Sequence, residues 1–292
     1  MAIVNFGSIN IDKVYRVSHF PAAGETLLVD GYSVGLGGKG ANQSIAMARA
    51  GADVRHIGAI GTDGLWTKQR LSDEGIDTDG IAVLENEATG HAVIEVDPSA
   101  ENKILVLSGA NAALTQDQID TAVGAMGADD WLLFQNETNL TEAIAAAGKA
   151  KGVRIAYSAA PFIADKVVPL LDMVDMICVN HLEAATLAEG YGGDMDAIPV
   201  SRLLVTYGAR GAEYRDDGHV EFVPSFKVDA VDTTGAGDTF LGSFLAAISK
   251  DAPGQHALLQ ASAAAALQVS RHGAADAIPT ADDVHKFLFS RA

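Results

Sequence analysis

Residues 231–240 read Val231-Asp232-Thr233-Thr234-Gly235-Ala236-Gly237-Asp238-Thr239-Phe240, a glycine-rich turn that runs directly into a predicted helix over Ala236–Ser249. Small residues let the backbone approach a ligand closely, and amide groups at a helix N-terminus attract an anion. Gly235–Gly237 is therefore a candidate anion hole. Asp238 is placed to accept a proton from an attacking hydroxyl group. The simpler interpretation is an ordinary turn in which Asp238 caps the helix.

Short apolar runs alternate with alanine-rich segments along the rest of the chain. The predicted strands are Ile3–Phe6, Val54–Ile60, Trp131–Gln135, Val153–Tyr157, Met176–Val179 and Leu203–Thr206. Besides Ala236–Ser249, helices are predicted over Gly40–Ala50 and about Gln255–Val269. This alternation is typical of an α/β fold, with a mostly parallel sheet and helices on both of its faces.

Two segments depart from this alternation. Glu25–Val34 and residues 88–107 alternate between apolar and polar residues, as strands with one exposed face do, and the second segment contains a polar turn at Asp97–Asn102. We expect them to form a small β-sheet, inserted from about residues 13–34 and 88–107 into a single domain of residues 1–292. Such a sheet can act as a lid, and its exposed face offers a surface for a homodimer.

Charge and hydropathy exclude some classes of partner. The chain has 20 basic and 38 acidic residues, a formal net charge of −18, which disfavours binding to nucleic acid. A nucleotide site is compatible with this charge, because backbone amides can hold phosphates. No apolar run reaches the ~18 residues that span a membrane, and the N-terminus opens directly with a strand-like segment. We therefore expect a cytoplasmic protein without membrane partners.

Polar residues follow the first predicted strand, where ligands of open α/β sheets commonly bind. In Gly7-Ser8-Ile9-Asn10-Ile11-Asp12, the side chains of Asn10 and Asp12 are candidates to bond vicinal hydroxyls, or they belong to a polar turn. The segment Gly35–Gln43 is rich in glycine and contains Lys39, but it lacks the spacing of the common phosphate-binding loop. Lys39 is either a ligand-binding residue or a solvated loop lysine.

Two further motifs follow strands in the second half of the chain. Asn180 and Glu183 lie one helical turn apart and either orient Mg²⁺ through its waters or form a capping box. Thr206-Tyr207-Gly208-Ala209-Arg210-Gly211 is a strand end that runs into a glycine turn. It is a candidate to hold the phosphates or ribose of a nucleotide, or it is a hairpin turn.

In this order, the motifs resemble the ribokinase family of carbohydrate kinases (PfkB superfamily) over essentially the whole chain. Gly38-Lys39-Gly40-Ala41-Asn42 is similar to the N-terminal signature of the family, and residues 232–238 are similar to its C-terminal signature. Further similarity lies in Gly7–Asp12, Gly109–Leu114 and Val269–Ala274. The resemblance implies a ribokinase-like three-layer α/β fold with a small β-sheet lid that commonly forms a dimer interface.

The resemblance also implies transfer of the γ-phosphate of ATP to the primary hydroxyl of a sugar, with D-ribose expected first. Asp238 would be the base, and the backbone of Gly235, Ala236 and Gly237 would be the anion hole. The sugar would be bound by Asn10, Asp12, Gly38, Lys39, Asn42, Glu137 and Asp238. The nucleotide would contact Asn180, Thr206, Gly208, Arg210, Gly211 and Gly237, with Glu183 assisting Mg²⁺ through water.

An activating monovalent cation, typically K⁺, is implied as well. It would be surrounded, mostly through carbonyl oxygens, by Asp232, Thr234, Gln268, Arg271, Gly273 and Ala277.

Three departures from the family lie on the nucleotide side. The stretch from Asn180 to Thr206 is short, so that a helix is expected to be truncated there. The family's Asn-Glu-x-Glu reads Asn180-His181-Leu182-Glu183, and Ser262 stands where Asn or His is frequent.

Other functions stay open at this point. A nucleoside kinase would present Phe134, Val93 or Ile94 to a base, and other relatives phosphorylate fructose or 2-keto-3-deoxygluconate. A non-catalytic sugar-binding regulator is a further alternative, but the intact Asp238 argues against it.

Overall fold

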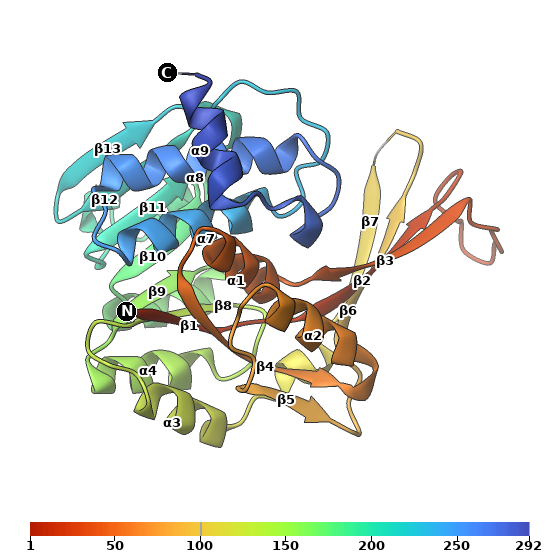
Figure 1. Ribbon diagram of the computed structural model, residues 1–292, viewed down its shortest axis with the longest axis horizontal. Coiled ribbons are helices and arrows are strands. Elements are labelled where there is room, and N and C mark those ends of the chain that lie inside the picture. Colours follow the sequence, from red (N-terminus) through yellow and green to blue (C-terminus); the bar gives the residue numbers. More distant parts are fainter. Residues whose placement is uncertain (100, 292) are drawn as a thin grey trace.

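A large twisted sheet forms the centre of the computed structural model, which describes residues 1–99 and 101–291. Within those residues the sheet has nine strands in the order β13-β12-β11-β10-β9-β8-β1-β4-β5 (Figure 1). Pairing is parallel from β11 to β5 and antiparallel for β12 and β13 at one edge. The strands are β1 (Ala2–Phe6), β4 (Asp53–Gly61), β5 (Ile81–Leu84), β8 (Trp131–Gln135), β9 (Arg154–Ser158), β10 (Met176–Asn180), β11 (Arg202–Thr206), β12 (Ala212–Asp216) and β13 (His219–Val223). The mostly parallel sheet predicted from the sequence is confirmed.

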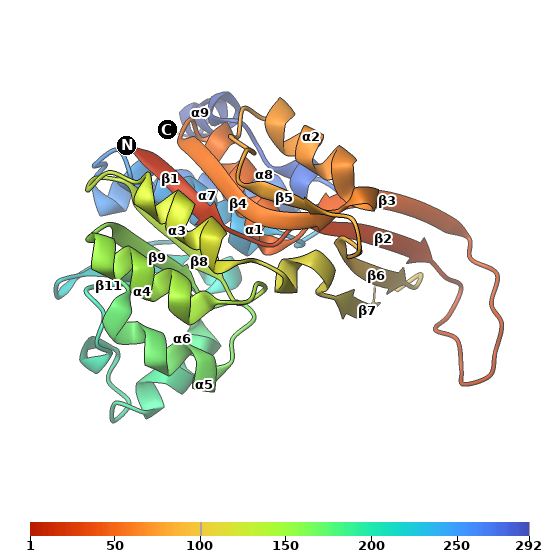
Figure 2. The same cartoon turned by 90° about the horizontal axis from the view of Figure 1, so that it is seen from below.

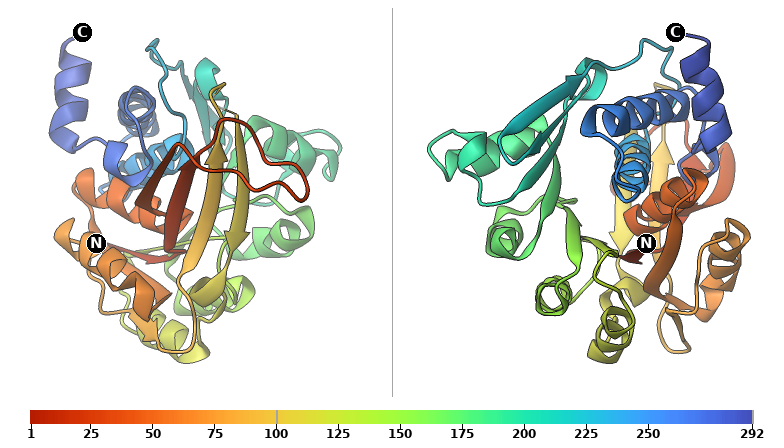
Figure 3. Two further views of the ribbon diagram at one scale, coloured as in Figure 1. Left: turned by 90° about the vertical axis from the view of Figure 1, so that its right-hand side faces the viewer. Right: turned by 60° about the vertical axis from the view of Figure 1, so that its left-hand side comes forward.

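Helices cover both faces of this sheet, which makes three layers (Figure 3). One face carries α1 (Lys39–Arg49), α2 (Leu65–Asp73), α7 (Ala236–Ile248), α8 (Gly254–Val269) and α9 (Ala281–Phe289). The other face carries α3 (Gln116–Gly124), α4 (Thr141–Lys151), α5 (Ala164–Val167) and α6 (His181–Glu189).

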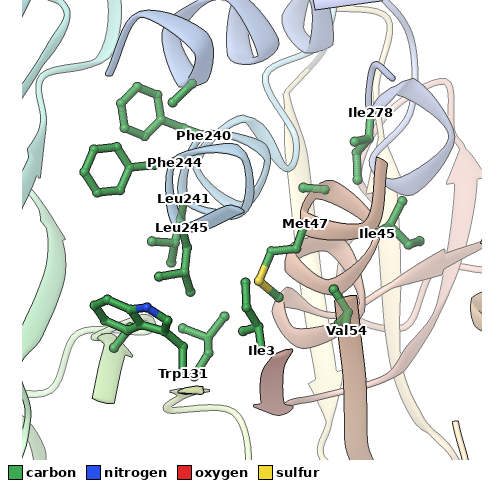
Figure 4. Packing of buried hydrophobic residues seen from close by; sticks show 14 of the residues in the cluster. Ile3, Ile45, Met47, Val54, Trp131, Phe240, Leu241, Phe244, Leu245 and Ile278 are labelled. Carbon is green, nitrogen blue, oxygen red and sulfur yellow. The ribbon is translucent and has the colours of Figure 1, made fainter. Parts of the chain in front are cut away.

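The central strands are apolar on both sides because each side meets a helical layer. In β8, Trp131 and Leu133 join one buried cluster, whereas Leu132 and Phe134 join the other. Figure 4 shows the first cluster, in which Trp131 lies near the side chains of α7.

The second sheet projects from the main body (Figures 1 and 2). Its order is β3-β2-β6-β7, and its strands are β2 (Asn10–Arg16), β3 (Gly31–Gly37), β6 (Gly90–Val96) and β7 (Asn102–Leu107). The predicted strand over Glu25–Val34 is wrong in its first half, because β3 begins only at Gly31. β2 was not predicted, and Asn10 and Asp12 lie in this strand rather than in a loop. Residue 100, inside the predicted Asp97–Asn102 turn, lies outside the described residues.

The short stretch after β10 contains one helix. α6 has nine residues, and Gly192 and Gly193 then adopt positive φ angles of 72° and 82° before a 3₁₀ turn at Met195–Ala197 leads into β11. Such φ angles favour glycine, which accounts for the glycine pair at this reversal. No helix in the described part of the chain has both the length and the apolar character needed to cross a membrane.

Helices α1 and α7 pack closely at Gly242. A Cβ atom on Gly242 would lie 2.5 Å from the Cβ of Ala46 and 2.9 Å from the carbonyl oxygen of Gln43. Only a hydrogen atom fits between the two helices at this point. The close approach brings the N-terminal turns of both helices together.

The substitution Gly242→Ala is expected to destabilise the protein by about 1–3 kcal/mol, because the added methyl group overpacks a well-filled contact. Urea unfolding followed by circular dichroism measures this difference. Gly124→Ala in α3 is the matched control, since its Cβ would meet nothing within 4 Å. The control should be neutral or slightly stabilising because alanine favours helix. Equal unfolding free energies for the two variants would contradict the proposed overpacking.

Candidate active site

The carboxylate of Asp238 lies at the start of α7, where Gly235 caps the helix in a left-handed conformation with φ 74°. It accepts hydrogen bonds from Gln43 Nε2 at 2.8 Å and from Asn42 Nδ2 at 3.2 Å. Both donors belong to α1. Burial raises the pKa of Asp238, and the nearby Lys39 and the two amides only partly lower it again. The raised pKa makes this carboxylate a better proton acceptor than an exposed one.

Gln43 belongs to a chain of buried polar side chains. Gln135 Nε2 donates to Gln43 Oε1 and to Asn5 Oδ1, in both cases at 2.8 Å. Asn5 donates to Ser44 Oγ at 2.8 Å, and Ser44 contacts Nδ1 of His56 at the same distance. Burial lowers the pKa of His56 to about 4, so its imidazole is neutral at pH 7. Such a connected network fixes the orientation of the Gln43 amide and directs its N–H groups toward Asp238 and Ser158.

Sequence reasoning missed the role of Gln43. The only local signal is its position next to Asn42 in the glycine-rich motif, and its partners lie 92 residues or more away in the chain.

Glu137 and Lys39, which were both predicted to bind the sugar, are in direct contact. Glu137 Oε2 accepts hydrogen bonds from Ser8 Oγ at 2.5 Å and from the backbone N–H of Lys39 at 3.0 Å. The carboxylate of Asp238 raises the pKa of Lys39, Glu137 adds to this effect, and burial opposes it. The ammonium group of Lys39 therefore stays charged between two acidic side chains. Ser8, for which no role was predicted, joins Glu137 to the N–H of Gly40 at 3.1 Å.

Asn10 and Asp12 enter the same region from β2. Asn10 Oδ1 accepts a hydrogen bond from Asn111 Nδ2 at 2.7 Å, which assigns a part to Asn111 that sequence reasoning missed. Asp12 lies against Gly37, because a Cβ atom there would be only 2.0 Å from Asp12 Oδ2. Burial, and to a smaller extent Glu137, raises the pKa of Asp12 to about 6.

The backbone at Gly38 has a positive φ of 89°, which favours glycine. It also lies against β2, because a Cβ atom on Gly38 would be 2.9 Å from the amide nitrogen of Asn10. The seven predicted sugar-site residues therefore lie together.

A cavity of about 460 Å³ borders the predicted anion hole. Its lining includes four predicted nucleotide residues, Thr206, Gly208, Gly211 and Gly237, together with Ser262 and several small apolar side chains. Ala236 also lines it, so the start of α7 is one of its walls. The cavity has room for a nucleotide base and ribose.

Two of the residues predicted to contact the nucleotide do not line this cavity. The guanidinium of Arg210 lies over the ring of Tyr207, 5.1 Å from its centre. Asn180 accepts hydrogen bonds from the N–H groups of Leu182 and Glu183, and Glu183 Oε2 accepts one from the Asn180 N–H. The capping box, one of the two interpretations of this motif, is thus present.

The carboxylate of Glu183 is close enough to Lys39 to contribute to the raised pKa of that lysine. No group of three or more His, Cys, Asp and Glu side chains that could hold a metal ion occurs among the described residues. Mg²⁺ in kinases is held largely by the phosphates of the nucleotide and by water, so a single carboxylate such as Glu183 fits it.

The residues of the predicted potassium site do not fit a cation, because a side-chain amide is hydrogen-bonded to the carbonyl oxygens there. Its residues do gather at the end of α8, but Gln268 Nε2 donates to the carbonyl oxygens of Thr234, Gly273 and Ala274 at 2.9–3.1 Å. An N–H donor and a cation compete for the same carbonyl oxygens.

Phe134 is fully buried and stacks on Tyr157, with ring centres 4.7 Å apart. It does not face a ligand, which removes one of the side chains that a nucleoside kinase would need toward the base.

The carboxylate of Asp238 lies beside the predicted anion hole Gly235–Gly237, between the polar cluster of Asn10 and Asp12 and a cavity large enough for a nucleotide. This arrangement suits phosphoryl transfer to a hydroxyl group. The model of the pfkB family of carbohydrate kinases matches residues 2–281. The chain belongs to this family. The expected kinase class and fold are confirmed.

Individual members of the pfkB family are similar to the chain over nearly its whole length. It is 37% identical to the ribokinase of Haemophilus influenzae over 97% of this chain and 96% of that protein. It is 31% identical to an ATP-dependent ribose-1-phosphate kinase of Halopiger xanaduensis over 99% and 98%. The solved structure of an Arabidopsis thaliana ribokinase complexed with ribose and ATP has a TM-score of 0.88 and 28% identity, covering 99% of each chain.

The raised pKa of Asp12 predicts that sugar binding weakens in acid. In the predicted contact, sugar hydroxyls would donate to the ionised carboxylate of Asp12. Protonation would remove an acceptor, so the dissociation constant for the sugar should rise as the pH falls through about 6. Between pH 7 and pH 5 we expect a rise of about tenfold, the change in ionised fraction of one such group. Calorimetric titration with sugar measures it.

Asp12→Asn should bind more weakly and lose this pH dependence, whereas Asp30→Asn, at an exposed carboxylate, should keep it. A wild-type dissociation constant that stays flat from pH 5 to pH 7 would count against the role of Asp12.

Proposed function

We propose that this pfkB-family kinase phosphorylates D-ribose at its primary hydroxyl, giving ribose 5-phosphate, with MgATP as donor. The observation that carries the proposal is the position of Asp238. Its carboxylate is held by Gln43 and Asn42 at the N-terminus of α7, between the polar cluster of Asn10 and Asp12 and the cavity bordered by Gly237.

In the proposed reaction, Asp238 takes the proton of the primary hydroxyl as the oxygen attacks the γ-phosphorus of ATP. The bond from the γ-phosphorus to the bridging oxygen breaks, and ADP leaves. The N–H groups at the start of α7 and the ammonium of Lys39 stabilise the negative charge that develops on the transferred group. Mg²⁺, bound to the phosphates with Glu183 assisting, would neutralise further charge, and potassium is not part of the proposed reaction.

A neutral sugar suits the charge of the polar cluster. Asp238 and Glu137 lie near the ammonium group of Lys39, and Asp12 lies near Glu137. A sugar phosphate would therefore meet more negative than positive charge. This favours ribose over the ribose 1-phosphate that the Halopiger relative is named for. Because ATP is the donor, we propose that the protein acts in the cytoplasm.

A phosphorylation screen with purified protein tests the substrate. We expect the highest kcat/KM for D-ribose among ribose, 2-deoxyribose, ribose 1-phosphate, fructose, 2-keto-3-deoxygluconate, adenosine and pseudouridine, measured through coupled ADP release. A higher kcat/KM for a nucleoside or a sugar phosphate would refute the ribose assignment but keep the kinase class.

The variant Asp238→Asn tests the mechanism. The amide cannot take up the proton, so kcat should fall by about 100- to 10,000-fold, while calorimetry still detects ribose binding. Near-normal turnover in this variant would rule out Asp238 as the base.

We also propose that the protein forms a homodimer through the small sheet. All six residues of the edge strand β7 are exposed, and four of them are large and apolar, namely Ile104, Leu105, Val106 and Leu107. Large apolar side chains exposed along one edge strand are typical of a contact with another chain. A second copy of the same sheet offers a matching surface.

The double variant Leu105→Glu/Val106→Glu places charge on both faces of β7 and should reduce the mass in solution from that of a dimer to the 30.3 kDa of one chain. Size-exclusion chromatography with light scattering measures it. Leu182→Glu, at an exposed residue of α6, is the control and should stay dimeric. A monomeric wild type, or a dimeric double variant, would argue against this interface.

A further inference from the structure

The end of α8 is tied to the turn before α7 by one buried side chain. Gln268 is fully buried, and its Nε2 lies 3.1 Å from the carbonyl oxygen of Thr234, 3.1 Å from that of Gly273 and 2.9 Å from that of Ala274. An amide nitrogen carries two hydrogens, so three acceptors share them. The amide therefore holds together two loops that are more than 30 residues apart in the chain.

Two of these carbonyl groups, those of Thr234 and Gly273, belong to the cage that the family resemblance assigns to a monovalent cation. Thr234 and Gly273 were expected to surround K⁺ through oxygen atoms, and here both oxygens accept from Gln268. The main-chain carbonyl of Gln268 itself accepts a hydrogen bond from the N–H of Arg271 at 3.1 Å. The cage is thus filled by a hydrogen-bond donor that the protein supplies.

The remaining members of the cage are also engaged elsewhere. Asp232 accepts hydrogen bonds from the N–H groups of Thr234 at 2.9 Å and Gly273 at 3.0 Å. The guanidinium of Arg271 turns to Asp283 at 3.5 Å. Both carboxylate oxygens of Asp232 therefore have a hydrogen-bond donor within the protein.

We propose that the Gln268 amide takes the place of the activating monovalent cation, so that the enzyme works equally well without K⁺. The three hydrogen bonds fix Thr234, which directly precedes the anion hole Gly235–Gly237, against the loop at Gly273 and Ala274. A cation bound to the same oxygens would supply the same restraint. This inference rests on the proposed kinase function, because it concerns the positioning of the anion hole.

The first test is a comparison of salts on the wild-type enzyme. Rates of ribose-dependent ADP release in KCl, NaCl and tetramethylammonium chloride at equal ionic strength should agree to within about twofold. An activating cation would change the rate by about fivefold or more, the low end of typical coupling between sites. Activation of that size by K⁺ in the wild type would overturn the proposal.

Two variants should create the requirement that the wild type lacks. Gln268→Ala leaves three carbonyl oxygens without their donor, and Gln268→Glu, of nearly the same shape, turns a carboxylate toward them. Both should lose about fivefold or more of their activity in tetramethylammonium chloride and recover it in KCl. Gln255→Ala, at an exposed residue of the same helix, is the control and should behave as wild type in every salt. Loss of activity that no cation restores in the folded Gln268→Glu variant would refute the exchange of amide for cation.

Two readouts do not depend on activity. K⁺ should raise the Tm of Gln268→Glu but leave that of the wild type unchanged, since only a site that binds the ion couples it to stability. In wild-type crystals soaked in RbCl, anomalous density between Thr234, Gly273 and Ala274 would mean that the amide is rotated and that its oxygen is a cation ligand. That result would overturn the proposal even if Gln268→Ala did not fold. If the wild type lacked kinase activity in every salt, the proposed function would fail, while these two readouts would still test the cage.

Discussion

The packing of α1 against α7 is the constraint on which the catalytic arrangement depends. α1 carries Asn42 and Gln43, and α7 carries Asp238, 195 or more residues further along the chain. The two helices approach because Gly242 has no side chain, and buried apolar residues of both helices join one core cluster. The hydrogen bonds to Asp238 are thus positioned by hydrophobic packing, whose free energy is far larger than theirs.

Several acidic groups lie close together around Lys39, and hydrogen-bond donors offset part of the repulsion between them. Asp238 and Glu137 lie near the ammonium group of Lys39, Asp12 lies near Glu137, and the pKa of both aspartates is raised. Amide and hydroxyl groups stabilise these carboxylates by donating hydrogen bonds to them, as Gln43 does to Asp238 and Ser8 does to Glu137. The result is a pocket rich in hydrogen-bond acceptors, which suits a neutral ligand with several hydroxyl groups.

The polar cluster lies where the two sheets meet. Only Gly7, Ser8 and Ile9 separate β1 of the main sheet from β2 of the small sheet, and α1 starts at the same place. Gly40 of α1 has no room for a side chain, since a Cβ atom would lie 2.3 Å from the Cα of Gly7. A movement of the small sheet would therefore pivot close to Asn10 and Asp12, so that closure of the proposed lid would also move two of the proposed sugar-binding residues.

The sequence by itself determined what depends on neighbours in the chain. Buried strands such as Trp131–Gln135, the helix that starts at Ala236 and the capping box of Asn180 follow from local pattern, because the interactions that form them span a few residues. The place of Asp238 at a helix start beside a glycine turn could be predicted for the same reason.

Only the tertiary structure decided the partners of the buried polar groups. Asn111 for Asn10, Gln135 for Gln43 and the three carbonyl groups for Gln268 were not predicted. β2 was also missed, because its residues form a strand only when β3 and β6 pair with it. An amide finds its partner where packing brings distant segments together, and no local pattern encodes that meeting.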